Sequence, residues 1–274
     1  MRYFNVSGPC NKRDHYMVEA ATRLKGVEQL IDMNQYFVIH AARQSGKTTY
    51  LKDLAARLKM VGRYHALYCS LEALQNVTDV EKGIAGIFDC LVLALKKASI
   101  PFHDYAQYNK EKYDHTLVFL TDFLTDLVQE LDKPLVIFFD EADCLSENPL
   151  ISFLRQLRLG YNDRDTSPFV HSIALVGMRN IRDYKAKIRP DSASLGSASP
   201  FNIVTKALTL TNFTREEIGD FYGQHTQECG QRFDTEAIDL IWEKSQGQPW
   251  LVNAIAREAI IEILASDYTK PVTA

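Results

Sequence analysis

One segment constrains the fold of this 274-residue chain most strongly: an apolar run enters a glycine-bearing turn that continues as a helical pattern. The run is Tyr36 to His40, the turn covers 41–48, and apolar residues then recur at helical spacing from Lys47 to Val61. Gly62 follows, as is common just past a helix end. Such a strand–turn–helix unit aims backbone N–H groups and a helix dipole at the turn, which predicts an anion site.

The turn reads Ala-Ala-Arg-Gln-Ser-Gly-Lys-Thr and matches the phosphate loop GxxxxGK[ST] at all but its first position. Gly46 allows close approach of the backbone, Lys47 is predicted to bind the β and γ phosphates, and the Thr48 hydroxyl to ligate Mg²⁺. Ala41 stands in place of the first glycine, where alanine fits if its φ is negative. The predicted nucleotide contacts include the rest of the loop as well: Ala41, Ala42, Arg43, Gln44, Ser45 and Thr49.

A second apolar run, Leu135 to Phe139, ends in the carboxylates Asp140 and Glu141. A buried strand would project both groups at its end. We expect Asp140 to hold the Mg²⁺ and Glu141 to orient or deprotonate the water that attacks ATP. An acidic pair after a strand is often a solvated turn, but its combination with the Lys47 loop favours a hydrolytic site.

Short apolar runs alternate with helical patterns along most of the chain, which indicates a parallel sheet with crossover helices. The runs are Tyr36 to His40, Tyr64 to Ser70, Leu135 to Phe139, His171 to Gly177 and Ile203 to Leu210. After them only helical patterns follow, opened by a capping box at Thr214 to Glu217. We therefore predict an α/β P-loop NTPase domain, a three-layer α/β/α parallel sheet, over 1–210, and a small helical lid domain over 211–274.

Further helices are expected at 47–61, 117–131, 150–159, 218–224, 235–245 and 250–264, and from a capping box at Thr78 to Glu81 through Leu95. Residues 101–112 are predicted to form a loop, and 189–200 the most linker-like segment.

Composition narrows the function classes. The net charge is −4, so no global basic field suggests nucleic acid, and the five cysteines show no metal-binding or disulfide spacing. Without an uncharged apolar run of membrane-spanning length, a soluble cytoplasmic protein is expected.

Glu141 beside Asp140 resembles the Walker B motif of the AAA+ and STAND classes of P-loop ATPase. More closely, the chain resembles bacterial AAA-like ATPase-domain proteins related to the archaeal ATPase and STAND groups. The resembling segments are 4–10 with 15–17, 41–49, 139–143, 176–183 with 188–190, and 247–249. The resemblance implies the ASCE/AAA+-like sheet, in which an extra strand lies between the Walker A and Walker B strands.

The resemblance also implies roles for single residues. It puts Tyr16 near the adenine, the alternative being a packing brace at the amino terminus. Pro249, in a Gly-Gln-Pro sequence like the GxP motif of the lid, is expected against the nucleotide or, alternatively, at a plain helix start.

The resemblance also assigns roles to arginines. Arg179, with Asn180, falls where relatives sense the γ-phosphate. Arg189 falls where AAA+ relatives carry an arginine finger, and its alternative is a solvated loop arginine. Arg155 and Arg158, three positions apart on one face of a short helix, could act in a similar role or could simply be solvated residues of that helix.

Several functions remain open at this stage. The first is an ATP-hydrolysing, STAND-like switch that controls homo-oligomer assembly or an effector protein. The alternatives are a DNA-loading initiator-like or transposition-regulator-like AAA+ ATPase and a nucleotide-binding regulator with little turnover. Asp140 to Asp143 spells Asp-Glu-Ala-Asp, but a helicase would need a second sheet domain, and no lid typical of a nucleotide kinase is evident. Proteins of the resembling groups continue into further helical segments, so a truncated or compact version is expected, and whether an effector or DNA-binding module belongs after Ala274 is open.

Overall fold

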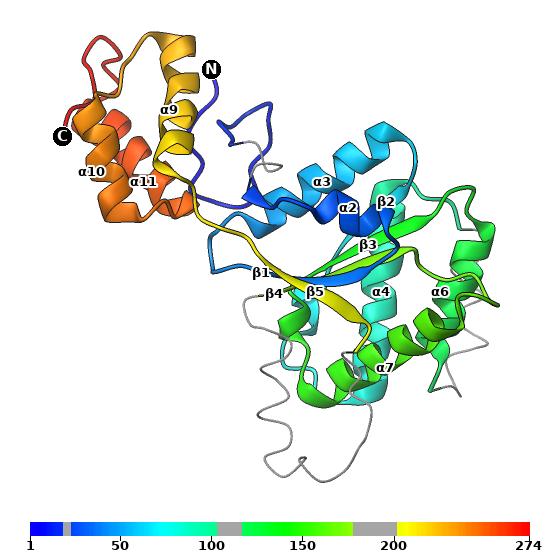
Figure 1. The fold of residues 1–274 in the computed structure, drawn as a ribbon. Helices are drawn as coiled ribbons and strands as arrows, with labels where there is room; N and C mark the ends of the chain where they lie inside the picture. The colour runs from blue at the N-terminus through cyan, green and yellow to red at the C-terminus, as the bar shows by residue number, and fades with distance from the viewer. Residues whose placement is uncertain (19–22, 103–116, 178–201) are drawn as a thin grey trace. The chain divides into compact units, whose positions relative to one another are not determined.

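The computed structural model describes residues 1–18, 23–102, 117–177 and 202–274. Its central element is a parallel sheet of five strands in the order β2-β3-β4-β1-β5 (Figure 1). The strands are β1 (Tyr36–His40), β2 (His65–Ser70), β3 (Leu135–Asp140), β4 (Ser172–Gly177) and β5 (Val204–Thr209). All five predicted strands are confirmed within a residue at each end, and β4 lies between β1 and β3, as the family resemblance implied.

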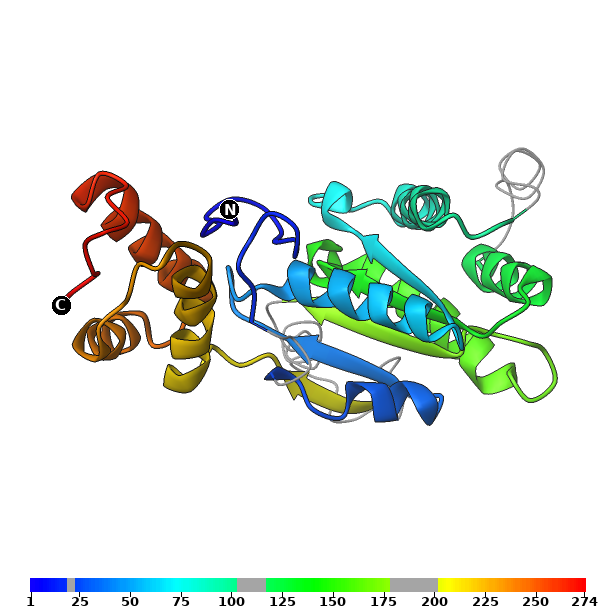
Figure 2. The ribbon, with the colours of Figure 1, turned by 90° about the horizontal axis from the view of Figure 1, so that it is seen from above.

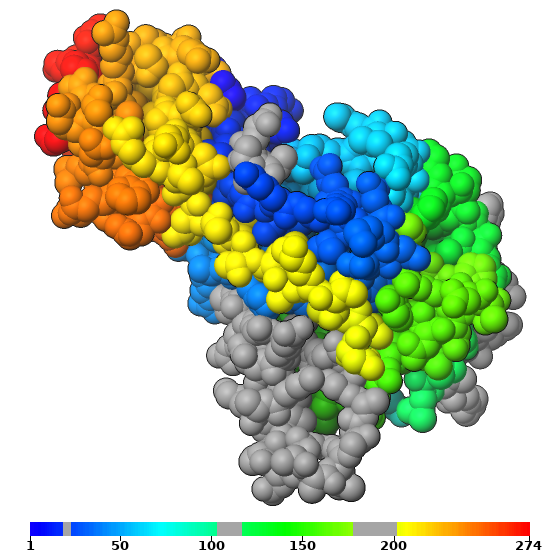
Figure 3. Space-filling view, viewed as in Figure 1, coloured from blue at the N-terminus to red at the C-terminus, as the bar shows by residue number. Residues whose placement is uncertain are grey.

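The strands differ in burial according to their place in the sheet. Every residue of β3 and β4 is buried, as expected of inner parallel strands with both faces covered. β5 is an edge strand with mostly exposed or half-buried residues, and it lies at the surface in the space-filling view (Figure 3). The acidic pair Asp140–Glu141 therefore lies at the carboxyl end of a deeply buried strand, β3.

Helices cover both faces of the sheet. On one face α4 (Val80–Ala98), α6 (Phe119–Glu130) and α7 (Glu147–Asp163) pack together and share one apolar core with alternate strand residues such as Leu67, Ile137 and Leu175. The intervening residues, such as Phe138, point to the opposite face. Figure 2 shows α3 (Lys47–Val61) over the sheet, and the short α2 (Val27–Asp32) precedes β1. This arrangement is the predicted α/β fold.

The predicted helices of this part form, with corrections at their ends. The helix from Lys47 to Val61 has the expected bounds, whereas α7 begins three residues earlier and ends four later than the pattern from 150 to 159. The capping box assigned to Thr78 is wrong, because the Asp79 carboxylate accepts from Lys82 N at 2.8 Å and caps α4. Most of the predicted 101–112 loop and all of the 189–200 linker lie outside the described residues.

The chain forms two compact units. One comprises Gly26–His40 and Leu51–Thr209 and contains the sheet. The other comprises Met1–Lys25, Ala41–Tyr50 and Leu210–Ala274. The second unit begins its long carboxyl-terminal part at Leu210, next to the predicted domain boundary. It also includes the amino-terminal 25 residues, which the sequence analysis grouped with the α/β domain.

The carboxyl-terminal part of the second unit consists of helices α9 (Arg215–Cys229), α10 (Thr235–Ser245) and α11 (Pro249–Glu258), followed by a π-helical turn, η4 (Ala259–Ile263). The capping box at the start of α9 is confirmed: the Thr214 hydroxyl accepts from Glu217 N, and the Glu217 carboxylate accepts from Thr214 N. None of the helices in the described ranges is long and apolar enough to cross a membrane.

Half of the buried residues in the core of this unit are aromatic, and the core includes residues from both chain ends. Phe4 and Tyr16, from the amino-terminal segment, are buried against Phe221 and Tyr222 of α9 and against Phe233. The rings of Tyr222 and Phe233 stack with their centroids 4.1 Å apart. The amino-terminal segment is therefore an integral part of the core around α9.

Candidate functional site

The turn after β1 has the backbone that its sequence predicts. Gly46 has a φ of 84°, a left-handed conformation that glycine adopts without strain, and α3 begins at the next residue. Gln44 also has a positive φ, of 59°. Ala41 is buried and does not belong to the described residues with positive φ, so alanine is compatible with the first position of the loop. The Ser45 hydroxyl donates to Ala42 O at 2.8 Å and closes the turn.

The loop side chains differ in exposure. Ser45 and Lys47 are buried, Thr48 and Thr49 are half-buried, and Ala42, Arg43 and Gln44 are exposed. The Thr49 hydroxyl accepts from Cys10 N at 3.0 Å, which fixes one side of this residue to the amino-terminal segment. Its hydroxyl hydrogen can still be donated, so the predicted phosphate contact of Thr49 stays compatible with the structure.

Two carbonyl groups of the loop accept hydrogen bonds from side chains outside it. The Arg23 guanidinium donates to Ser45 O at 3.0 Å, and the Gln248 amide donates to Arg43 O at 3.4 Å. Sequence analysis missed both residues. No motif marks Arg23, and Gln248 was noted only as the middle residue of a possible lid motif. Their role depends on contacts between distant segments that periodicity does not predict.

Asp140 is held rigidly at the end of β3. Its side chain is almost completely buried; Oδ1 accepts from Glu141 N at 3.0 Å, and Oδ2 accepts from the Tyr68 hydroxyl of β2 at 2.9 Å. Asp140 pairs with Ser70 across the sheet, so the ends of these two strands are level. These two hydrogen bonds fix the direction of the buried Asp140 carboxylate.

Glu141 follows in an unusual conformation, with a φ of 57° and a ψ of 36°. A left-handed backbone at a residue other than glycine costs of the order of 1 kcal/mol or more and is concentrated at functional sites. The residue is half-buried, and the Cys144 thiol is 4.0 Å from its Oε2. The structure thus strains the backbone at the residue predicted to act on water.

The pKa of Cys144 reflects the negative charge near the end of β3. The pKa of its thiol is raised to about 11, most by burial and then by the carboxylates of Glu141, Asp143, Glu72 and Asp140, in that order of effect. Each carboxylate opposes the formation of a thiolate. The end of β3 is therefore strongly electronegative, a property suited to a bound cation and unsuited to a cysteine nucleophile.

The end of β4 lies against the same acidic segment. A Cβ built on Gly177 would be 2.7 Å from Oδ1 of Asp143, so only glycine fits without movement. The predicted sensor residues Arg179 and Asn180 and the predicted finger Arg189 lie outside the described residues. On α7, Arg155 is exposed and Arg158 is half-buried.

Tyr16 is enclosed by protein. Its ring lies against Phe4 with the centroids 4.8 Å apart, and the Arg2 guanidinium lies 4.9 Å from the ring centroid. Its hydroxyl is 3.1 Å from His225 Nδ1 and from a Glu228 carboxylate oxygen. This packing corresponds to the brace interpretation, and the adenine contact of Tyr16 stays a prediction.

Pro249 is the first residue of α11 and is buried, the helix-start geometry that was one of its two interpretations. Gly247, two residues earlier, has a φ of 70°, and a Cβ there would overlap the backbone of Phe213. Phe213 N also donates to Gly247 O at 2.8 Å. The glycine of the Gly-Gln-Pro sequence is thus required for a close backbone approach.

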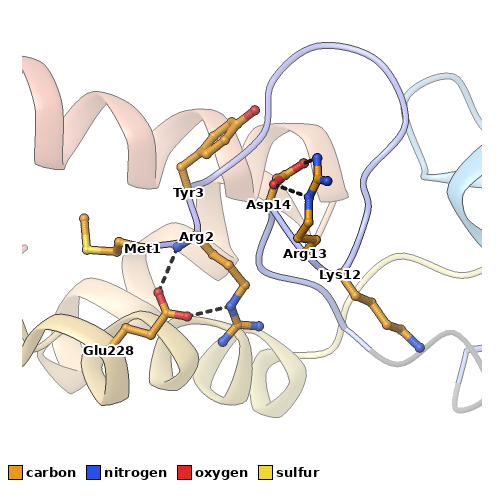
Figure 4. A pocket seen from close by; sticks show the side chains of 7 residues that line it. All are labelled: Met1, Arg2, Tyr3, Lys12, Arg13, Asp14 and Glu228. Atoms are coloured by element: carbon orange, nitrogen blue, oxygen red, sulfur yellow. Dashed lines mark hydrogen bonds and ion pairs between the residues drawn. The ribbon is translucent and has the colours of Figure 1, made fainter.

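A shallow polar pocket lies elsewhere in this unit, around the first residues of the chain (Figure 4). It is lined by Met1, Arg2, Tyr3, Lys12, Arg13, Asp14 and Glu228. Figure 4 shows Arg2 paired with Glu228 and Arg13 paired with Asp14. None of the predicted nucleotide or metal ligands lines it, so it is a surface feature distinct from the phosphate loop.

The strand order, the loop after β1 and the acidic end of β3 define the fold of the P-loop AAA+ ATPases. From residue 8 to residue 267 the sequence matches the model of the AAA-like domain family, and the chain belongs to that family. No curated protein matches the sequence significantly.

Three of the solved structures with this fold are archaeal proteins. A Walker-type ATPase of Pyrococcus abyssi matches over 97% of this chain and 73% of its own, with a TM-score of 0.65 and 17% identity. Cdc6p of Pyrobaculum aerophilum matches over 93% of this chain and 66% of its own, with a TM-score of 0.56 and 15% identity. The Orc1 protein of Aeropyrum pernix, solved in complex with DNA, matches over 90% of this chain and 61% of its own, with a TM-score of 0.55 and 13% identity. The chain thus spans just under two thirds of the length of the last two proteins.

Proposed function

We propose that this protein binds ATP with Mg²⁺ through the loop 41–49 and hydrolyses it with the carboxylates that end β3. The observation that carries the proposal is the sheet order. β1 and β3 are parallel and separated only by β4, so their carboxyl ends lie at one edge of the sheet. β1 continues directly into the phosphate loop, and β3 ends at Asp140, followed by Glu141. In open parallel sheets ligands bind outside the carboxyl ends of the strands.

Each residue has a role that follows from its chemistry. Lys47 and the N–H groups at the start of α3 bind the phosphates, and Glu141 accepts a proton from, or orients, the attacking water. The Thr48 hydroxyl and the Asp140 carboxylate are oxygen donors, which Mg²⁺ prefers, and the electronegative surroundings of Asp140 fit a divalent cation. Bound Mg²⁺ would neutralise charge on the phosphates.

The remaining predicted roles form part of the same proposal. Arg179 senses the γ-phosphate, and Arg189 completes the site of a neighbouring copy as an arginine finger. Tyr16 and Pro249 contribute to the nucleotide-binding side. We test the roles of the two arginines singly with Arg179→Ala and Arg189→Ala. A loss of turnover with unchanged ATP affinity supports a catalytic role, and unchanged turnover removes the residue from the proposal.

Steady-state ATP hydrolysis tests the main proposal. Lys47→Ala is expected to abolish binding and turnover, and Glu141→Gln to lower turnover by about 10² or more while ATP still binds. Glu147→Gln, at an exposed position on the first turn of α7, is the matched control and should behave like wild type. Equal rates in all four proteins would refute the catalytic assignment.

For the biological role we propose a nucleotide-dependent switch of the STAND or AAA type, in which ATP controls assembly of the chain or the activity of an effector. The test is the mass of the protein in solution with and without a non-hydrolysable ATP analogue. An increase with the analogue supports the switch, and an unchanged monomer in both conditions contradicts assembly control.

A DNA-loading function is the second candidate, because the fold resembles that of Orc1, which was solved in complex with DNA. The net charge of −4 gives it no general electrostatic support. ATP-dependent, salt-sensitive retention of duplex DNA would favour this candidate over the effector switch, and no retention at low salt would exclude it.

A further inference from the structure

Arg23 joins the phosphate loop to the segment that enters α9. Besides Ser45 O in the loop, the same terminal nitrogen of its guanidinium, Nη2, contacts Thr211 O. The guanidinium also lies over the ring of Phe213, 4.8 Å from the ring centroid. Thr211 and Phe213 lie in the short connection between Leu210 and Arg215, where the carboxyl-terminal helices begin. One side chain thus contacts both the loop and this connection.

The connection is fixed from its other side by the turn before α11. Phe213 N donates to Gly247 O at 2.8 Å, and the Asn212 amide donates to Gln246 O at 3.0 Å. Gln248, the next residue of that turn, donates to Arg43 O in the loop. The phosphate loop, the connection at 211–213 and the turn before α11 are therefore each in contact with the other two. Arg23 links the loop to the connection, and Gln248 links the turn to the loop.

The electrostatics of Arg23 favour a further anionic contact. Burial lowers the pKa of its guanidinium to about 10, an effect that Glu217 and Tyr50 only partly oppose. Among the described residues no acceptor is in hydrogen-bond reach of its buried Nε. Its Nη1 lies 3.5 Å from where a Cβ of residue 46 would be, beside the glycine that precedes Lys47. A half-buried cation whose Nε is buried without an acceptor is attracted to any anion bound in the loop.

We propose that Arg23 is a positioning residue that couples nucleotide occupancy of the phosphate loop to the conformation of the helical segment 210–274. The proposal rests on the proposed binding of ATP to this loop. Phosphate draws the guanidinium toward the loop and weakens its contacts with Thr211 and Phe213. Because these residues begin the helical segment, the bound and empty states differ in how that segment is held. Coupling of this kind is reciprocal, so loss of the Arg23 contacts also changes nucleotide affinity.

The two tryptophans of the chain provide the measurement, because both lie in the helical segment. Trp250 is in the first turn of α11 and donates through Nε1 to Val6 O at 2.9 Å. The exchange Trp242→Phe leaves Trp250 as the sole reporter. In this background we would follow the emission of Trp250 during titration with ADP and with a non-hydrolysable ATP analogue. Occupancy would be measured separately by equilibrium dialysis of labelled nucleotide.

With Arg23 present, nucleotide is expected to change the emission of Trp250. Arg23→Met is expected to bind nucleotide about tenfold more weakly, a change of about 1.4 kcal/mol, and to show no emission change at full occupancy. Arg23→Lys, which keeps the charge but loses the planar fork, should restore part of the change. Lys25→Met, at a neighbouring exposed position, is the control and should keep the full change. A merely structural role would not remove the signal from a folded, saturated variant.

Three results would overturn the proposal: a full Trp250 response in saturated Arg23→Met, a full response in saturated Arg23→Lys, or no response in the protein that retains Arg23. Circular dichroism establishes the folding of each variant, and Arg23→Lys decides the outcome if Arg23→Met does not fold. Absence of nucleotide binding with Arg23 present would refute the proposed function itself, which distinguishes the two failures.

Discussion

The two cores of this protein are built in different ways. The sheet and the helices α4, α6 and α7 share a core whose inner strands, β3 and β4, are short apolar runs, contiguous in sequence and buried on both faces. Half of the buried residues in the core around α9 to α11 are aromatic, and two of the buried rings, Phe4 and Tyr16, come from the opposite end of the chain. The first core follows from local pattern, whereas the second depends on contacts between residues more than 200 positions apart.

The same difference separates the two halves of the candidate site. Asp140 is oriented by its neighbours in the sheet, Tyr68 and Glu141. The phosphate loop is held by Arg23 and Gln248, from the amino-terminal segment and the helical segment. We infer that changes in the helical core reach the phosphate loop more directly than changes of equal size in the sheet core. The following predictions test how the contacts of the two regions stabilise them.

The largest effect is expected from Phe4→Ala. The Phe4 ring is buried and contacts five other rings, and the loss of such a ring typically costs about 3–5 kcal/mol. Urea unfolding followed by tryptophan emission measures it, since both tryptophans are in the helical segment. Tyr3→Ala, at an exposed position, is the control and should change the free energy of unfolding by less than about 1 kcal/mol. Equal effects would show that Phe4 is not part of the helical core.

Gly247→Ala should lower the free energy of unfolding nearly as much as Phe4→Ala. The added Cβ would overlap the backbone of Phe213 at a positive φ, so a cost of about 2–4 kcal/mol is expected. Gly219→Ala in α9, where a Cβ meets nothing within 4 Å, should be neutral or stabilising by up to about 1 kcal/mol. Thermal unfolding of both variants measures the difference. A stable Gly247→Ala protein would mean that the connection at Phe213 can move away from the turn.

Helix caps allow one matched comparison between the two regions. Asp79→Ala on α4 and Thr214→Ala on α9 should each cost about 1 kcal/mol, because each removes a side-chain acceptor from a helix N-terminus. Thr78→Ala should cost less than about 0.5 kcal/mol, since Thr78 is not the cap. Urea unfolding monitored by far-ultraviolet circular dichroism measures the free energy of unfolding of the three variants. A larger loss for Thr78→Ala than for Asp79→Ala would contradict the assigned cap.

The smallest effect is a pH dependence within the helical core. Burial lowers the pKa of His225 below its usual 6.5, although the hydrogen bond to Gln231 and the charge of Glu228 partly oppose this. The unfolded chain therefore binds a proton at higher pH than the folded chain, and stability falls as the pH drops below about 6.5. His225→Gln should flatten this fall by less than about 1.4 kcal/mol per pH unit, measured by urea unfolding at pH 7.5 and 5.5. Identical slopes would refute it.

Much of the fold could be predicted from sequence because its signals are local. Short, largely apolar runs located the five strands, and the sequence Thr-Arg-Glu-Glu located the start of α9 through a cap within four residues. The cap of α4 is Asp79 and not Thr78, a difference that residue type does not reveal, because both residue types cap helices and the two positions differ only in the local backbone. The strand order followed from family resemblance and not from pattern, since pairing in a parallel sheet is set by contacts between distant segments.

The candidate site could be predicted only in part for the same reason. The Gly-Lys-Thr turn carries its own backbone requirement, and Ala41 met the condition of a φ that is not positive. Arg23 gave no signal, because its partners Ser45 and Thr211 are 22 and 188 positions away. The left-handed backbone of Glu141 could not be predicted either, because such a position is usually marked by glycine or asparagine and not by glutamate.

The most direct test of the central claim is the identity of the nucleotide retained after one turnover. Wild type, Lys47→Ala and Glu141→Gln would each be mixed with Mg²⁺ and less than one equivalent of labelled ATP. Bound and free nucleotide would then be separated and identified. We predict that wild type converts ATP to ADP, that Glu141→Gln retains uncleaved ATP, and that Lys47→Ala retains no nucleotide. Conversion of ATP by Glu141→Gln at the wild-type rate would contradict the assignment of hydrolysis to the end of β3.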